Sequence, residues 1–226
     1  MLRRELKLGR WGSVNPKKSW WVLVIVALGV MVPFSWPYLT LNPASSWIAT
    51  TSETLQYPVL VAHIGLALIA LLSGFLQFVD RIRLTHPHLH RLSGRIYVGS
   101  VGASGVLALV LVGYVENFSK AVSFLALAHL WLYTSWRGYR SAVRGDFQAH
   151  RSWMIRSFGF TLVAVSARLL VPALLLAYAG LHAFSLPGGR EQMVEEVLNV
   201  NIWAGIVLNM GIVEWMVLRR SRQERD

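Results

Sequence analysis

The sequence contains no cysteine, and this absence removes several kinds of chemistry at once. Disulfides, thiolate metal ligands and iron–sulfur clusters all need cysteine sulfur. A metal or cofactor must therefore be held by histidine, carboxylate, tyrosine or methionine side chains. The sequence also lacks a Ser-His-Asp pattern and a glycine-rich phosphate loop, which argues against a hydrolase and against a nucleotide-binding protein.

Charged residues are scarce as well. They make up 15% of the 226 residues, whereas hydrophobic residues make up 54%. In a soluble domain about a quarter of the residues are charged. The composition is therefore that of an integral membrane protein.

Acidic residues are the rarer of the two charged classes, with 11 against 22 basic residues and a net charge of +11. In a soluble protein such an excess suggests nucleic-acid binding. Here the basic residues gather at the ends of apolar runs, where they orient a protein in the bilayer and contact anionic lipid. We therefore expect membrane lipid as a partner, and no nucleic acid.

Six apolar runs reach the length of about 20 residues that a helix needs to cross a bilayer core. Because a helix satisfies its own backbone groups within lipid, we expect an all-α, polytopic protein with six transmembrane helices. The connections are too short to form a core of their own, so residues 1–226 are expected to form a single membrane domain. The expected spans are residues 20–39, 57–79, 94–115, 119–141, 152–179 and 195–218, and the second to fifth form a central four-helix bundle.

The connections alternate between basic and non-basic. Basic residues concentrate in the cytoplasmic loops of membrane proteins, so this alternation predicts that both termini are cytoplasmic. The basic stretches are the two ends of the chain and residues 80–93 and 137–151, and the others are residues 40–56, 116–120 and 180–196.

Four histidines form two layers in this topology. His63 and His129 lie in the second and fourth spans, in the outer half of the membrane or near its middle. His90 and His150 lie at the starts of the third and fifth spans, near the inner face. Each layer thus takes its pair of histidines from alternate helices of the central bundle.

Two neutral imidazoles from facing helices hold a b-type haem in a four-helix bundle. We therefore expect each histidine pair to ligate the iron of one haem b, so that up to two haems carry electrons across the membrane. This reading makes the protein a membrane oxidoreductase with a quinone or another small redox partner. The helix order and histidine layers are similar to those of the di-haem transmembrane cytochrome b family that uses ascorbate, and more loosely to ferric reductases.

Other readings of the histidines stay open. Membrane histidines also form hydrogen bonds between helices, and the histidine run over residues 86–90 has spacing that suits Zn or Cu. A non-redox transporter or structural subunit that binds an anionic lipid or solute is the alternative function. The oligomeric state is not determined by the sequence.

Arginines gather at the same inner face as the second histidine pair. A guanidinium binds carboxylate or phosphate through two hydrogen bonds, so these arginines suit haem propionates, a quinone head group or an anionic substrate. Contact with lipid phosphate fits them equally well. A further arginine lies deep in the fifth span, towards the outer side. A propionate, Glu195 or Glu196 would serve as its partner there, and snorkelling to the outer interface is the alternative. The inner arginines are Arg91, Arg95, Arg151 and Arg156, and the deep one is Arg168.

Two motifs carry a family resemblance. They are HRLSGRIY at residues 90–97 and AHRSWMIRS at residues 149–157, preceded by AHIG at residues 62–65 and GFLQF at residues 74–78. On these motifs the chain resembles a bacterial family of predicted membrane proteins, domain of unknown function 2306, over roughly residues 57–160. The resemblance implies a multi-span bundle in the bacterial cytoplasmic membrane and supplies no established activity.

Overall fold

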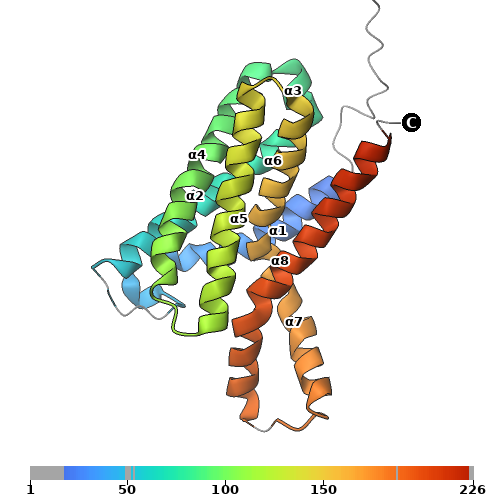
Figure 1. Cartoon of the computed structure of the whole chain (residues 1–226). Helices are drawn as coiled ribbons and strands as arrows, with labels where there is room; N and C mark the ends of the chain where they lie inside the picture. Colours follow the sequence, from blue (N-terminus) through green and yellow to red (C-terminus); the bar gives the residue numbers. More distant parts are fainter. Residues whose placement is uncertain (1–17, 49–51, 53, 187, 224–226) are drawn as a thin grey trace, which may run out of the picture.

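The computed structural model describes residues 18–48, 52, 54–186 and 188–223. Within these ranges the regular structure is entirely helical, which confirms the all-α prediction (Figure 1). The elements are α1 (Lys18–Leu39), η1 (Pro43–Ser45), α2 (Gln56–Gln77), α3 (Asp80–Thr85), α4 (Pro87–Val112), α5 (Phe118–Val143), α6 (Phe147–Thr161), α7 (Val163–Leu181) and α8 (Gly189–Gln223).

Five of the described helices are long and apolar enough to cross a membrane, namely α1, α2, α4, α7 and α8. The fourth predicted span corresponds to α5, which has 26 residues. Lys120, His129 and Arg137 are spread along α5 and lower its mean hydropathy. The structure therefore supports a multi-pass helical membrane protein, but α5 does not meet the criterion that the other five helices meet.

The central bundle is formed by α2, α4, α5 and α6. Each of these helices packs against the next, and α6 also touches α2. Tyr97, Trp131 and Phe158 are buried between them. Trp20 of α1 packs edge-on against Phe75, with ring centroids 5.4 Å apart, and also contacts Phe158. Helix α1 therefore covers one side of the bundle.

The fifth predicted span is broken at Leu162 into α6 and α7. Helix α6 stays in the bundle, whereas α7 leaves it and packs against α8 as a projecting hairpin (Figure 1). Thr161 Oγ1 donates a hydrogen bond to Ser157 O at 3.2 Å, and such side-chain bonds to the preceding turn often bend helices. The expected continuous span over residues 152–179 was therefore wrong, and the break lies well before Pro172.

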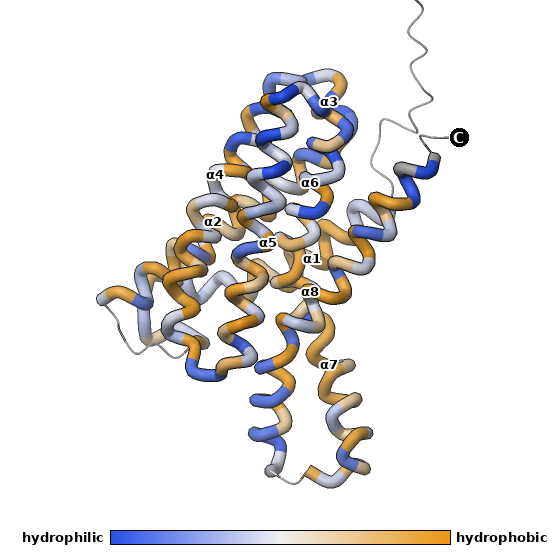
Figure 2. Tube along the Cα trace, viewed as in Figure 1, coloured by the Kyte–Doolittle hydropathy of each residue, from blue (hydrophilic) through white to orange (hydrophobic). Residues whose placement is uncertain are grey.

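Two ends of the bundle are used below as landmarks. The α3 end holds α3, the first turns of α4 and α6, and the turn between α5 and α6. The η1 end holds η1, the first turn of α2 and the connection between α4 and α5. Figure 2 shows hydrophilic residues gathered at the α3 end and at both ends of α8, with mainly hydrophobic residues between them.

Candidate functional site

The α3 end brings His90 and His150 close together. His90 lies in the first turn of α4 and His150 in the first turn of α6, and both are half-buried. The inner pair expected from the sequence therefore lies at one end of the bundle, on two different helices.

Hydrogen bonds within the described chain do not occupy every ring nitrogen of His90 and His150. His150 Nδ1 lies 2.8 Å from Gly138 O. A carbonyl oxygen only accepts, so Nδ1 of His150 carries the proton and Nε2 of the neutral ring keeps its lone pair. His90 Nδ1 is buried and has no hydrogen-bond partner among the described residues. The α3 end therefore holds two imidazoles, and each has a ring nitrogen that no described hydrogen bond occupies.

Hydrogen bonds from Gln77 position His90 and the start of α4. Gln77 of α2 donates to His90 O at 3.1 Å and to Ser93 Oγ at 2.5 Å. A Cβ at Gly94 would lie 3.1 Å from Gln77 Oε1, a tight contact that would press on the Gln77 side chain. This role of Gln77 was not predicted from the sequence, where it is only a polar residue at the end of an apolar run.

His63 and His129, the other predicted pair, form hydrogen bonds with different partners. His63 Nδ1 lies 2.9 Å from both O and Oγ of Ser104, and Ser104 Oγ donates to His63 O at 3.1 Å. His63 therefore ties α2 to α4. His129 is exposed on α5, and its Nδ1 lies 2.9 Å from Leu125 O of the same helix. Within the described part of the chain, no hydrogen bond or charge interaction links His63 to His129.

The histidine run at residues 86–90 does not assemble a three-ligand metal centre. His86 and His88 are exposed, and His86 Nδ1 lies 2.7 Å from Thr85 Oγ1. Across the described residues, no group of three or more His, Asp or Glu side chains is arranged to hold a metal ion.

The inner arginines differ in what surrounds them. Arg91 and Arg95 are exposed at the start of α4, and Arg151 is half-buried. Arg156 donates to both carboxylate oxygens of Glu214 on α8, at 2.6 and 2.8 Å. Arg156 therefore already holds an anion of its own chain, whereas Arg91 and Arg95 face outward.

A stacked arrangement extends from Arg156. Its guanidinium carbon lies 4.9 Å from the ring centroid of Trp153, and that of Arg137 lies 4.7 Å from the same ring. Tyr133 packs edge-on against Trp153 and accepts a hydrogen bond from Arg137 at 3.2 Å. These contacts link α5, α6 and α8 near the α3 end.

A buried polar network crosses the middle of the bundle. The hydroxyl of Tyr97 lies 2.8 Å from Ser157 Oγ and 2.9 Å from Thr161 Oγ1, and Trp131 Nε1 donates to the same Thr161 oxygen at 2.9 Å. Tyr97 is only 1% exposed. The network joins α4, α5 and α6, and the sequence did not predict it.

Arg168 lies on α7, away from the arginines of the α3 end. Its Nη1 donates to Ala164 O at 2.6 Å, and its guanidinium carbon lies 3.6 Å from the ring centroid of Phe34 on α1. The partners expected for it, Glu195 and Glu196, are exposed on α8, and neither forms an ion pair with it. The sequence therefore identified this half-buried arginine without identifying what surrounds it.

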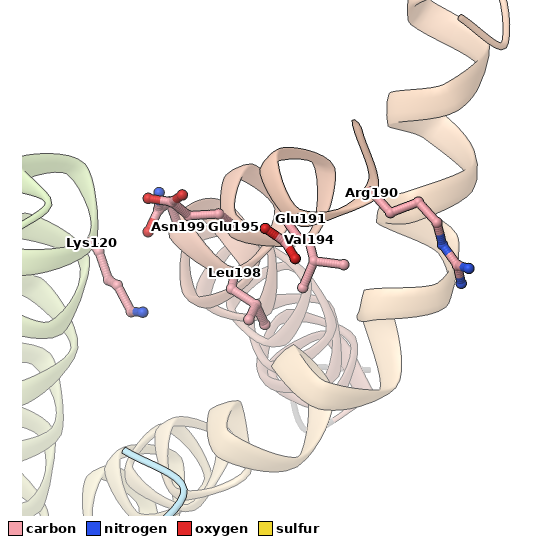
Figure 3. Close-up of a pocket in the computed structure, with 7 residues that line it drawn as sticks. All are labelled: Lys120, Arg190, Glu191, Val194, Glu195, Leu198 and Asn199. Atoms are coloured by element: carbon pink, nitrogen blue, oxygen red, sulfur yellow. The ribbon is translucent and has the colours of Figure 1, made fainter. Parts of the chain in front are cut away.

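A hollow of about 480 Å³ opens between the start of α5 and the first turns of α8. Figure 3 shows Lys120 on one side of the hollow, facing Glu195 and Asn199, while Arg190 points away from them. None of the residues predicted as site residues lines this hollow. Its lining comprises Lys120, Arg190, Glu191, Val194, Glu195, Leu198 and Asn199.

One comparison with known proteins gives a match. A family model described as "Predicted membrane protein (DUF2306)" matches residues 60–217, which is well over half of the chain. The matched range includes the four histidines and Arg168. No curated protein and no solved structure matches the chain.

Proposed function

The chain belongs to the DUF2306 family of predicted membrane proteins, and from this premise we propose that it is a haem-binding electron-transfer protein of the bacterial cytoplasmic membrane. What supports this proposal is the pair of imidazoles at the α3 end. His90 Nδ1 is buried and unpartnered within the described residues, and His150 keeps Nε2 free. These two histidines would hold the iron of one haem b.

The surroundings of His150 fit this role. Iron-ligating histidines usually donate their second ring N–H to a carbonyl or carboxylate, which fixes the tautomer and the ring orientation. Gly138 O provides such an acceptor for His150. Arg91 follows His90 in the sequence and is exposed, and its positive charge suits a propionate, whereas Arg83 is already paired with Asp80 at 2.8 Å. When bound, haem would supply one-electron transfer, and the protein would supply its ligands and orientation.

A second haem has less support. His63 would have to give up its contacts with Ser104, and the exposed His129 would have to turn inward. The proposal therefore places the first haem at the α3 end and treats the pair of His63 and His129 as the weaker half of a two-haem path.

Sidedness forms part of the proposal. The basic loops favour a cytoplasmic location for both termini and for the α3 end. Arg91 and Arg95 are exposed there and would meet a quinone or another small electron carrier. Electrons would thus enter or leave on the cytoplasmic side.

The reduced and oxidised visible spectra of the purified full-length protein, expressed with haem supplied, test this proposal. We expect Soret and α bands that are lost in His90→Ala and in His150→Ala. His182→Ala is the matched control, because His182 bonds only within its own helix turn, to Tyr178 O. A colourless wild-type protein, or bands unchanged in both ligand variants, would contradict the proposal.

A second candidate function is a non-redox transporter or structural subunit that binds an anionic lipid or solute. The exposed arginines at the start of α4 favour it, because lipid phosphate would reach them as readily as an electron carrier. Under this alternative the protein is colourless, and His90→Ala changes only folding or transport.

A further inference from the structure

Arg168 is a cation in an apolar helix without a described carboxylate partner. Helix α7 is one of the five described helices that are apolar enough to cross a membrane. A guanidinium has five N–H donors, and among the described residues Arg168 uses one, towards Ala164 O. Ionisable residues at such depth are rare and mark ligand or ion sites when they lack a partner.

The ring of Phe34 positions this guanidinium. The guanidinium carbon of Arg168 lies 3.6 Å from the ring centroid of Phe34, the distance of a close cation–π contact. Phe34 is five residues before the end of α1, which at 1.5 Å per residue is about 7.5 Å from that end. The guanidinium is therefore held beside the last two turns of α1.

Buried hydroxyl groups without described partners belong to the apolar cluster against which Phe34 packs. Tyr38 follows Phe34 by one helical turn, with ring centroids 5.8 Å apart. Tyr38 is fully buried, yet its hydroxyl has no hydrogen-bond partner among the described residues. The hydroxyl of Tyr57 is also unpartnered and belongs to the same apolar cluster as Tyr38. Buried polar groups almost always have a partner, so these hydroxyls need an acceptor.

We propose that Arg168 and Tyr38 bind the phosphate group of an anionic ligand between α1 and α7. The guanidinium would donate to two oxygen atoms of the phosphate and the tyrosine hydroxyl to a third. Trp36, two residues after Phe34 on α1, and Leu169, the residue after Arg168 on α7, are exposed apolar side chains. This combination of a cation and an apolar surface suits an anionic phospholipid, and a free phosphate shares the same head-group chemistry.

This site is independent of the proposed haem. Arg168 contacts the last turns of α1, which lead into η1, whereas His90 and His150 lie at the α3 end. Loss of one site should leave the other unchanged, so the two proposals can fail separately.

The test is native mass spectrometry of the full-length protein in a non-ionic detergent. One sample receives dioleoylphosphatidylglycerol and another receives inorganic phosphate alone. We expect one tightly retained ligand in the wild type and at least about tenfold weaker retention in Arg168→Gln, because two charge-assisted hydrogen bonds are lost. The matched control is Arg190→Gln, which removes the same charge from an exposed residue on α8 and should retain the ligand like the wild type.

Tyr38→Phe provides a second variant that removes only an unpartnered hydroxyl. Without ligand it should melt at the wild-type temperature or higher, because a buried polar group without a partner is unfavourable. With phosphatidylglycerol its gain in melting temperature should be smaller than that of the wild type. This variant keeps the test valid if Arg168→Gln does not fold.

The outcomes separate the sources of the ligand. Retention of phosphatidylglycerol that depends on Arg168 identifies a lipid, and retention of phosphate that depends on Arg168 identifies a free anion. Equal retention by wild type and Arg168→Gln, or an equal loss in Arg190→Gln, would overturn the proposal.

Discussion

Individual polar residues decide most of the chemistry that this bundle can support. His90 and Tyr38 have buried polar atoms without described partners, whereas the guanidinium of Arg156 donates two hydrogen bonds to Glu214. In an apolar environment an unpartnered group needs a ligand, and a paired group serves the fold. The same residue types therefore divide into candidate site residues and structural ones according to their partners.

Tyr97 belongs to the structural class, and Tyr97→Phe should show it. The substitution leaves Ser157 and Thr161 without the hydroxyl that they share. We expect a loss of about 1–3 kcal/mol in stability, the usual effect of breaking a buried hydrogen bond on one side. Thermal or denaturant unfolding in detergent measures it. Tyr139→Phe is the control, because Tyr139 is 51% exposed, and equal stability of the two variants would contradict the account.

The sequence identified several site residues because histidine and arginine are conspicuous in apolar runs. His90 and His150 were predicted as a pair and both lie at the α3 end, and Arg168 was recognised as needing a partner. The sequence did not reveal the network around Tyr97, since serine, threonine and tyrosine are common in membrane helices and a hydroxyl shows no preference until its neighbours are known. The sequence also did not show that His129 is exposed on α5. Hydropathy locates the ends of a span, but it does not determine which side of the helix a residue occupies.

At the scale of helices, close approach depends on glycine. Gly159 on α6 faces α8, and a Cβ there would lie 2.5 Å from Val213 Cγ2. Asn209 of α8 donates to Gly159 O at 2.9 Å. The contact between α6 and α8 therefore requires a residue without a side chain at this position.

Gly159→Ala should push α6 and α8 apart. Val213 is β-branched and cannot move its methyl group away easily, so we expect a loss of about 1–3 kcal/mol in stability. Gly211→Ala is the matched control on α8, because its Cβ would meet no atom within 4 Å. Alanine favours a helix over glycine, so the control should be neutral or slightly stabilising. Comparable destabilisation of both variants would contradict the close approach.

The bend at Leu162 explains why the fifth helix was predicted only in part. Hydropathy marks how long an apolar run is, but it does not register a change of direction inside the run. The bend follows Thr161, whose hydroxyl bonds to Ser157 O and also meets Tyr97 and Trp131 from other helices. These partners are distant in the sequence, so the pairing of α7 with α8 was not predictable from the run itself.

For the whole molecule, composition was enough to predict a helical membrane protein. A low charge content and long apolar runs leave few alternatives in a bilayer. The number of spans was harder to predict, because α5 lies within the bundle but carries polar residues along its length. A helix shielded by neighbours can carry such residues, and hydropathy alone does not distinguish this case from a helix outside the membrane.

Sidedness can be tested cleanly because the chain has no cysteine. We predict that Ala44→Cys, in η1, reacts with a membrane-impermeant maleimide on intact cells. His88→Cys, at the α3 end, should react only after the membrane is opened. Both positions are exposed, so accessibility to the reagent depends on the side of the membrane. The reverse pattern would contradict a cytoplasmic α3 end.

The central claim is that His90 and His150 together ligate one haem iron. Electron paramagnetic resonance of the oxidised full-length protein tests it most directly, because two imidazole ligands give ferric haem a low-spin signal. We predict a low-spin signal in the wild type that becomes high-spin or disappears in His150→Ala. Absence of a ferric haem signal in the wild type, or a low-spin signal that persists unchanged in His150→Ala, would contradict the claim.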